Sequence, residues 1–222
     1  MSADTRECEQ CGTSFVPRRE HARFCSALCR AAWNREHAGD LAAGTSALVW
    51  SVTAMSESMQ QLSQTGTADL ARGLTLISEA VWWVTIVDAT LVRHHPAPYD
   101  SVMAGQPPAQ REQVEATLAG LRFVRNKIGG GAGLGEFADP GTSRPHTRER
   151  RVTGWRWRPV PESVLGSLPP RGRAWEKARY KGYQAQLAGH TIGETIGRAA
   201  AFLKLAATNA TAVTDNGVQA GR

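Results

Sequence analysis

Residues 8–29 read CEQCGTSFVPRREHARFCSALC and contain every cysteine of the 222-residue chain. Two residues separate Cys8 from Cys11, and three separate Cys25 from Cys29. Thirteen residues lie between the two pairs. Four thiolates at this spacing suit a tetrahedral zinc ion, which binds sulfur at about 2.3 Å. The pattern therefore predicts a four-cysteine zinc site in a small amino-terminal finger.

The residues beside the cysteines suit such a site. Gly12 permits the positive φ of a tight knuckle, in which backbone N–H groups point at sulfur. Ser26 is suited to cap a helix that starts directly after it, which would place Cys29 in the first turn. A disulfide pair, or four unrelated thiols, is the alternative. The lack of cysteine in the rest of the chain, and of a secretory signal before the motif, favours zinc.

The spacing of the cysteines and their neighbours follows the pattern CxxCG…F…P…RFCSxxC. The matching positions are Cys8, Cys11, Gly12, Phe15, Pro17, Phe24, Cys25, Ser26 and Cys29. This stretch resembles the small treble-clef or zinc-ribbon fingers of the FCS and MYM type, over residues 1–38. The resemblance implies a structural zinc ion and contacts with protein or nucleic acid.

Beyond the finger, the chain shows helical periodicity. Apolar residues recur at steps of three and four over 46–64, 68–94, 108–128 and 180–208. Long amphipathic helices with mostly short connections predict an antiparallel helical bundle, so the expected fold class is mainly α. Strand signals are scarce outside the finger, and the best alternation is VTGWRW at 152–157.

The segments between the helices complete the domain organisation. We expect a linker over 36–44 and a loop over 95–107, because both are poor in helical periodicity. The pattern divides the chain into a four-cysteine zinc finger at 1–38, a helical bundle domain at 45–208 with a basic Trp/Arg-rich, hairpin-like insertion at 140–180, and a disordered tail at 209–222.

The formal charge of +6 is distributed unevenly along the sequence. Residues 1–38 carry six arginines and five acidic residues, and four thiolates on Zn²⁺ would make this part slightly negative. Residues 144–181 carry eleven basic and three acidic residues, a net +8. The charge therefore predicts that RNA or DNA, if bound, meets the carboxyl-terminal half and not the finger.

The basic segment also contains tryptophans that alternate with arginines. On a strand, Trp155 and Trp157 would face one side and Arg156 and Arg158 the other. The tryptophans would either stack on bases or cover the bundle core while the arginines stay in water. The candidate nucleic-acid-binding residues are Arg144, Arg148, Arg150, Arg151, Trp155, Arg156, Trp157, Arg158, Arg171 and Arg173.

Arg125 and Asn126, in LRFVRNKIGG, form the other motif of interest. They resemble the Arg-Asn start of the ribonuclease motif of HEPN-type helical domains, which are small bundles and often pair, so the resemblance implies a homodimer. In that family a histidine follows the Arg-Asn pair within about six positions, whereas in this chain the first histidine after Asn126 is His146. The alternative is structural: Arg125 pairs with Asp88, the one acid on the apolar stripe of the second predicted helix.

Together these patterns favour a binding or regulatory protein over an enzyme, because no catalytic set of side chains stands out. No apolar run approaches the length of a bilayer span, so we expect a cytoplasmic protein without a membrane partner. The leading prediction is a zinc-finger protein that contacts nucleic acid. The alternatives are a HEPN-like ribonuclease with a degenerate site and a protein-interaction module whose partner covers the finger or a groove at Gly189, Gly193 and Gly197.

Overall fold

The computed structural model describes residues 5–16, 23–29, 32, 40–130, 133–141, 154–165 and 170–219. The chain divides into two compact units, Met1–Ala47 and Leu48–Arg222. Each unit is described by itself.

The first unit contains a short antiparallel ribbon. Strand β1, Arg6–Glu7, pairs with β2, Ser14–Phe15, with Arg6 opposite Phe15. Helical backbone follows at 27–29, directly after the second cysteine pair begins. Among the described residues of 5–29, Cys8 alone is buried. This part of the chain therefore has no hydrophobic core among the residues that the structure describes.

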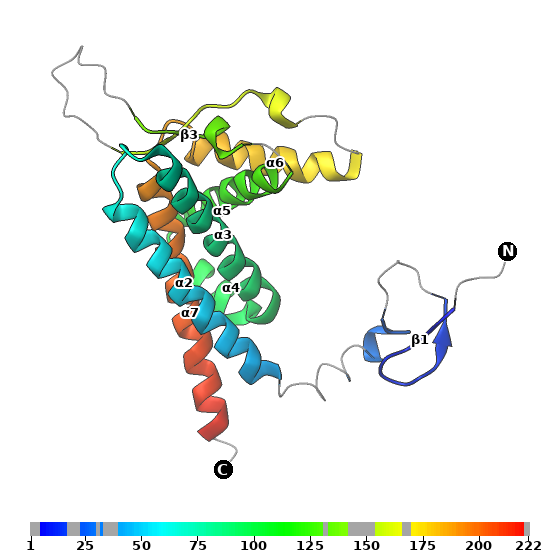
Figure 1. Cartoon of the computed structure of the whole chain (residues 1–222). Helices are drawn as coiled ribbons and strands as arrows, with labels where there is room; N and C mark the ends of the chain where they lie inside the picture. Colours follow the sequence, from blue (N-terminus) through cyan, green and yellow to red (C-terminus); the bar gives the residue numbers. More distant parts are fainter. Residues whose placement is uncertain are drawn as a thin grey trace. The chain divides into compact units, whose positions relative to one another are not determined.

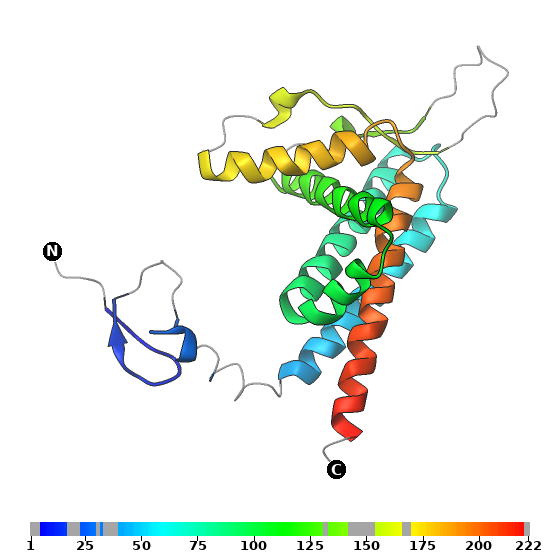
Figure 2. The same cartoon turned by 180° about the vertical axis from the view of Figure 1, so that it is seen from behind.

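The second unit is mainly helical, which confirms the predicted fold class. Helix α3 packs against α5 and α7, α4 packs against α7, and α6 packs against α5 (Figure 1 and Figure 2). A two-stranded antiparallel pair joins β3 to β4, with Ala138 opposite Trp157. The elements are α2 (Asp40–Gln64), α3 (Leu70–His94), α4 (Pro96–Ala104), α5 (Pro108–Gly129), η1 (Leu134–Glu136), β3 (Ala138–Asp139), β4 (Arg156–Trp157), η2 (Glu162–Leu165), α6 (Pro170–Gln186) and α7 (Ile192–Gln219).

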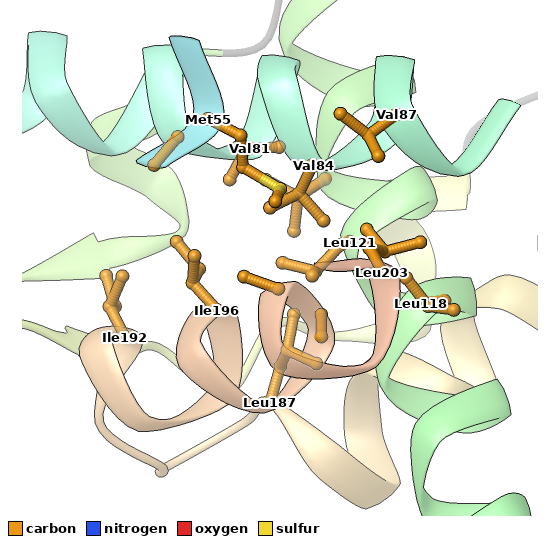
Figure 3. Close-up of a cluster of buried hydrophobic side chains, with 14 of the residues drawn as sticks. Met55, Val81, Val84, Val87, Leu118, Leu121, Leu187, Ile192, Ile196 and Leu203 are labelled. Carbon is orange, nitrogen blue, oxygen red and sulfur yellow. The ribbon is translucent and has the colours of Figure 1, made fainter. Parts of the chain in front are cut away.

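The core of this unit is built from apolar side chains of successive helices. Met55 of α2 meets Val81 and Val84 of α3, and side chains of α5 and α7 close the cluster from the other side (Figure 3). Each large aliphatic side chain buried in this way contributes about 1.5–3 kcal/mol. The apolar periodicity that predicted the helices thus corresponds to the faces that pack.

Helix α3 lies at the centre of this packing and is unusually apolar. By length and composition alone it could cross a membrane, so the expectation that no apolar run approaches a bilayer span is wrong. Half of its most apolar window is buried inside the unit, where Ile77, Val84 and Leu91 belong to the core. A helix that is apolar on most sides is expected at the centre of a packed helical unit.

Three predicted boundaries are corrected by the structure. The expected loop at 95–107 contains α4, because Pro96 is tolerated in the first turn and the apolar side chains Val102 and Met103 are buried. The expected linker at 36–44 overlaps α2, which begins at Asp40. The expected disordered tail is helical over most of its length, because α7 continues to Gln219.

The last predicted helix, 180–208, is two helices. Helix α6 ends at Gln186 and α7 begins at Ile192, with a turn between them in which Gly189 adopts a φ of +79°. The predicted groove at Gly189, Gly193 and Gly197 is therefore wrong. Beyond its chain neighbours and its own helix backbone, a Cβ atom added at any of these glycines would meet nothing within 4 Å, so no helix among the described residues packs closely against them.

Close helix approach occurs instead between α5 and α6. A Cβ atom on Gly182 would lie 2.5 Å from the carbonyl oxygen of Ala116, and one on Gly120 would lie 3.0 Å from the backbone of Tyr183. The two helices run antiparallel, since Gly120 meets Tyr183 while Asn126, further along α5, bonds Glu176. Glycine on both helices thus allows their backbones to touch.

We predict that Gly182→Ala destabilises the helical unit by about 1–3 kcal/mol, because its methyl group collides with backbone that cannot move aside. The measurement is the free energy of unfolding in urea. Gly197→Ala is the matched control, since it also lies in a helix but has open space around it. The control should raise the free energy of unfolding by about 0.5–1 kcal/mol, because alanine loses less backbone entropy than glycine when a helix folds. Equal effects of the two changes would contradict the close packing of α5 on α6.

Candidate metal centre and basic segment

Two short segments bring the four cysteines together. In the first, Gly12 has a φ of +68° and its N–H donates to the carbonyl oxygen of Cys8 at 2.8 Å, which forms the predicted knuckle. The Cys8 N–H donates to the Thr13 carbonyl at 3.0 Å. In the second, the Ser26 hydroxyl oxygen accepts from the N–H of Cys29 at 3.1 Å, as expected of a helix cap.

A backbone bond and an ion pair join these two segments. The N–H of Glu9 donates to the carbonyl oxygen of Arg23 at 3.0 Å. The Arg23 guanidinium also forms two bonds to the Glu9 carboxylate, one of them from Nε at 2.7 Å. Because both side chains are about half exposed, the ion pair adds little stability, but it fixes which segments face each other.

The four sulfur atoms form a compact cluster. All four lie within 4.8 Å of one another. The Sγ of Cys25 lies 3.7 Å from that of Cys11 and 3.5 Å from that of Cys29. In a tetrahedral zinc site with sulfur at about 2.3 Å, neighbouring sulfurs would be about 3.8 Å apart. The four cysteines therefore fit a single metal ion of this kind, as their spacing predicted.

The surroundings divide the cysteines by proton affinity. Burial opposes ionisation of Cys8, but backbone N–H groups, led by that of Cys25, outweigh it and lower its pKa to about 6. Bonds from Thr13 lower the pKa of Cys11. The neighbouring sulfurs, above all that of Cys29, raise the pKa of Cys25 to about 12. Part of the cluster thus favours thiolate, and a divalent metal would displace the remaining protons.

The two tryptophans of the basic segment are buried in the core, whereas stacking on bases would require them to be exposed. Trp155 and Trp157 are only 5% and 1% exposed, and the indole N–H of Trp157 donates to the Thr195 hydroxyl at 2.8 Å. Backbone bonds tie β4 to the turn between α6 and α7, where the N–H of Gly189 donates to the carbonyl oxygen of Trp157 at 2.8 Å. Of the two alternatives for these tryptophans, the one in which they cover the core is confirmed. They are therefore not available to stack on bases.

The neighbouring arginines are engaged within the protein. The Nη1 of Arg156 donates to the Gly189 carbonyl at 3.0 Å, and the Arg158 guanidinium lies 3.8 Å from the Asp139 carboxylate. Four further predicted contact residues, Arg144, Arg148, Arg150 and Arg151, lie outside the described residues. Arg171 and Arg173 lie in the first turns of α6.

The predicted pair of Arg125 with Asp88 is wrong by one helical turn. Asp88 instead accepts from Nε of Arg122 at 2.6 Å and from the Tyr99 hydroxyl at 3.2 Å. The Arg125 guanidinium lies over the ring of Trp82, 4.7 Å from its centre. These two side chains border a small apolar pocket of about 260 Å³ between α3 and α5, which sequence reasoning did not find.

Asn126 is also in a structural contact. Its side-chain N–H donates to Oε1 of Glu176 at 2.8 Å, and Arg179 donates to the same oxygen at 2.8 Å. Glu176 is buried, and its second oxygen has no partner among the described residues. The Arg125–Asn126 motif therefore helps to hold α5 against α3 and α6.

We predict that Arg122→Ala destabilises the protein by about 2–4 kcal/mol, because it leaves the buried Asp88 carboxylate without its counter-charge. Burial already raises the pKa of Asp88 against the opposing effect of Arg122, and the substitution raises it further. Because the pKa of Asp88 is higher in the folded than in the unfolded state, the free energy of unfolding falls as the pH rises from the unfolded value through the folded value. The variant should therefore be less stable at about pH 8 than at about pH 5.

The control for this prediction is Arg125→Ala, one turn along the same helix. It removes only the contact with Trp82 and should cost about 1 kcal/mol or less, with no added pH dependence. The readout is urea unfolding of each variant at both pH values. A larger cost for Arg125→Ala than for Arg122→Ala would contradict the assignment of the ion pair.

Comparisons of this chain with protein-family models, with curated proteins and with solved structures give no match. The likeness to FCS and MYM fingers and to HEPN domains therefore rests on the quoted residues alone. What the structure itself supports is four amino-terminal cysteines placed to hold a metal ion, in a chain that is otherwise mainly helical.

Proposed function

We propose that this chain is a zinc-binding protein of the binding or regulatory kind, in which zinc folds the amino-terminal finger. The observation that carries the proposal is the cluster of four Sγ atoms within 4.8 Å. Among the described residues of 5–29, only Cys8 is buried, so a hydrophobic core does not account for the fold of this part. Metal coordination is the usual substitute in so small a unit.

The donor set supports zinc in a structural role. Four thiolates are soft ligands and a tetrahedral arrangement of sulfur is typical of zinc. A site with four protein ligands leaves no open position for water or substrate, in contrast to catalytic zinc sites. The finger therefore serves as a folded binding module and not as an active site. Its thiols also favour a reducing compartment such as the cytoplasm.

A second proposal concerns nucleic acid, and α6 supports it. This helix contains five cations and one acid, Glu176, whose carboxylate is buried against α5. The helix therefore has a net charge of +4, whereas residues 1–38 with Zn²⁺ would be slightly negative. A cationic helix attracts phosphate. We infer that the helical unit, through α6, makes the contact with RNA or DNA that the charge distribution predicted.

We predict one zinc ion per chain in the purified protein, measured by elemental analysis. Cys25→Ser should abolish stoichiometric zinc, because structural sites of this kind contribute about 10–16 kcal/mol of apparent binding energy. Ser26→Ala is the control: it removes the cap of Cys29 but no ligand, so zinc should remain. Stoichiometric zinc in Cys25→Ser, or none in the native chain, would contradict the proposal.

For nucleic acid, we predict an affinity that falls linearly with salt concentration on logarithmic axes, because each phosphate contact releases counterions. Lys181→Ala on α6 should reduce this slope by the value for one lost phosphate contact, about 0.9 on a duplex and about 0.7 on a single strand. Lys204→Ala on α7 is also an exposed lysine and serves as the control, with an unchanged slope. Fluorescence anisotropy of a labelled oligonucleotide gives both slopes. An affinity that does not change with salt concentration would rule out the proposal.

A further inference from the structure

The tryptophan of α6, Trp175, is far more exposed than is usual for so large an apolar side chain. Trp175 is 71% exposed, the most of any described tryptophan, whereas Trp155 and Trp157 are almost fully buried. Indole is large and apolar, and exposing it to water is unfavourable, so it is usually covered in a folded protein. Trp175 therefore takes no part in the hydrophobic core of the helical unit.

The place of Trp175 along α6 accounts for its exposure. Gly182 brings the backbone of α6 against α5. Trp175 lies seven residues, about two turns, before Gly182 and so on nearly the same side of α6, but closer to the amino-terminal end of the helix. In Figures 1 and 2, the amino-terminal part of α6, drawn in yellow, extends past the end of α5.

The neighbours of Trp175 leave its ring open and the surrounding charge positive. Ala174 and Ala178 are exposed and too small to cover the indole. Lys181 is exposed and has no acidic partner among the described residues. The acids nearby are already neutralised, because Glu162 pairs with Lys177 at 3.2 Å and Glu176 with Arg179 at 2.8 Å. An anionic partner would therefore meet little repulsion here.

We infer that α6 binds single-stranded nucleic acid, with Trp175 as the platform on which one base stacks. This inference rests on the proposed contact of α6 with nucleic acid and names its form. An unpaired base offers a free π-face to an indole, whereas a base in a duplex is covered by its neighbours. Lys181, six residues or about 9 Å further along the helix, then meets a phosphate further along the same strand.

A membrane surface is a different partner that a basic helix with tryptophan could contact. Binding to a membrane surface requires a broad apolar face, with several large side chains inserted among the lipids. Around Trp175 the exposed residues are alanine and lysine, which supply little apolar area. The single aromatic ring within a cationic surface fits a strand of nucleic acid better.

The test uses the full chain with zinc bound, a labelled single-stranded oligonucleotide, and the same sequence as a duplex. We expect tighter binding to the single strand. Trp175→Ala should weaken single-strand binding about tenfold to a hundredfold, the range measured for one base stacked on an aromatic side chain. Trp175→Phe should restore part of the affinity, because phenylalanine also stacks. The dependence on salt should stay unchanged, since no phosphate contact is removed.

Trp50→Ala is the matched control, because Trp50 of α2 is also exposed, at 62%, but lies outside α6. It should leave the affinity unchanged. Salt-dependent binding that Trp175→Ala does not weaken, or that prefers the duplex, would overturn this inference and leave the charge-based proposal intact. No salt-dependent binding by the native chain would overturn both. Binding of the chain to anionic vesicles but not to the oligonucleotide would point to a membrane and also refute the inference.

Discussion

Four sulfur atoms held within 4.8 Å of one another are the feature on which the amino-terminal unit depends. The rest of its described residues contribute short strands, turns and exposed side chains, with Cys8 alone buried. Hydrophobic burial, the main stabilising term of most domains, is nearly missing from this part. We propose that a metal ion bound by the two cysteine segments replaces it. The helical unit is stabilised in the opposite way, by a core that draws on α2, α3, α5 and α7.

In the helical unit, the glycine contact between α5 and α6 links packing to surface charge. Close backbone approach at Gly120 and Gly182 fixes which side of α6 faces inward. That side carries Glu176 and the two tyrosines, so the acid is buried, whereas Lys177 and Lys181 are exposed. The orientation of α6 thus decides which of its described charges reach the surface that we propose as the partner surface.

The cysteine cluster was predictable from sequence because ligand spacing is a local property, and the helices were predictable because their apolar period is local too. Other features depended on tertiary packing. Arg122 and Arg125 are one turn apart, and the crossing of α3 and α5 decides which of them reaches Asp88. Gly189 has the spacing of a helical groove but forms a left-handed turn. The exposure of Trp175 depends on where α5 ends alongside α6, which no local pattern reveals.

Hydrogen exchange on the full chain, before and after a chelator removes zinc, tests most directly whether metal binding maintains the finger. Zinc removal should abolish the protection of finger amides such as that of Cys8, which donates to Thr13 in the folded unit. Amides within α3 and α5 should keep theirs, because their own core stabilises them. Finger amides that stay protected without metal, or helices that lose protection together with the finger, would contradict this division.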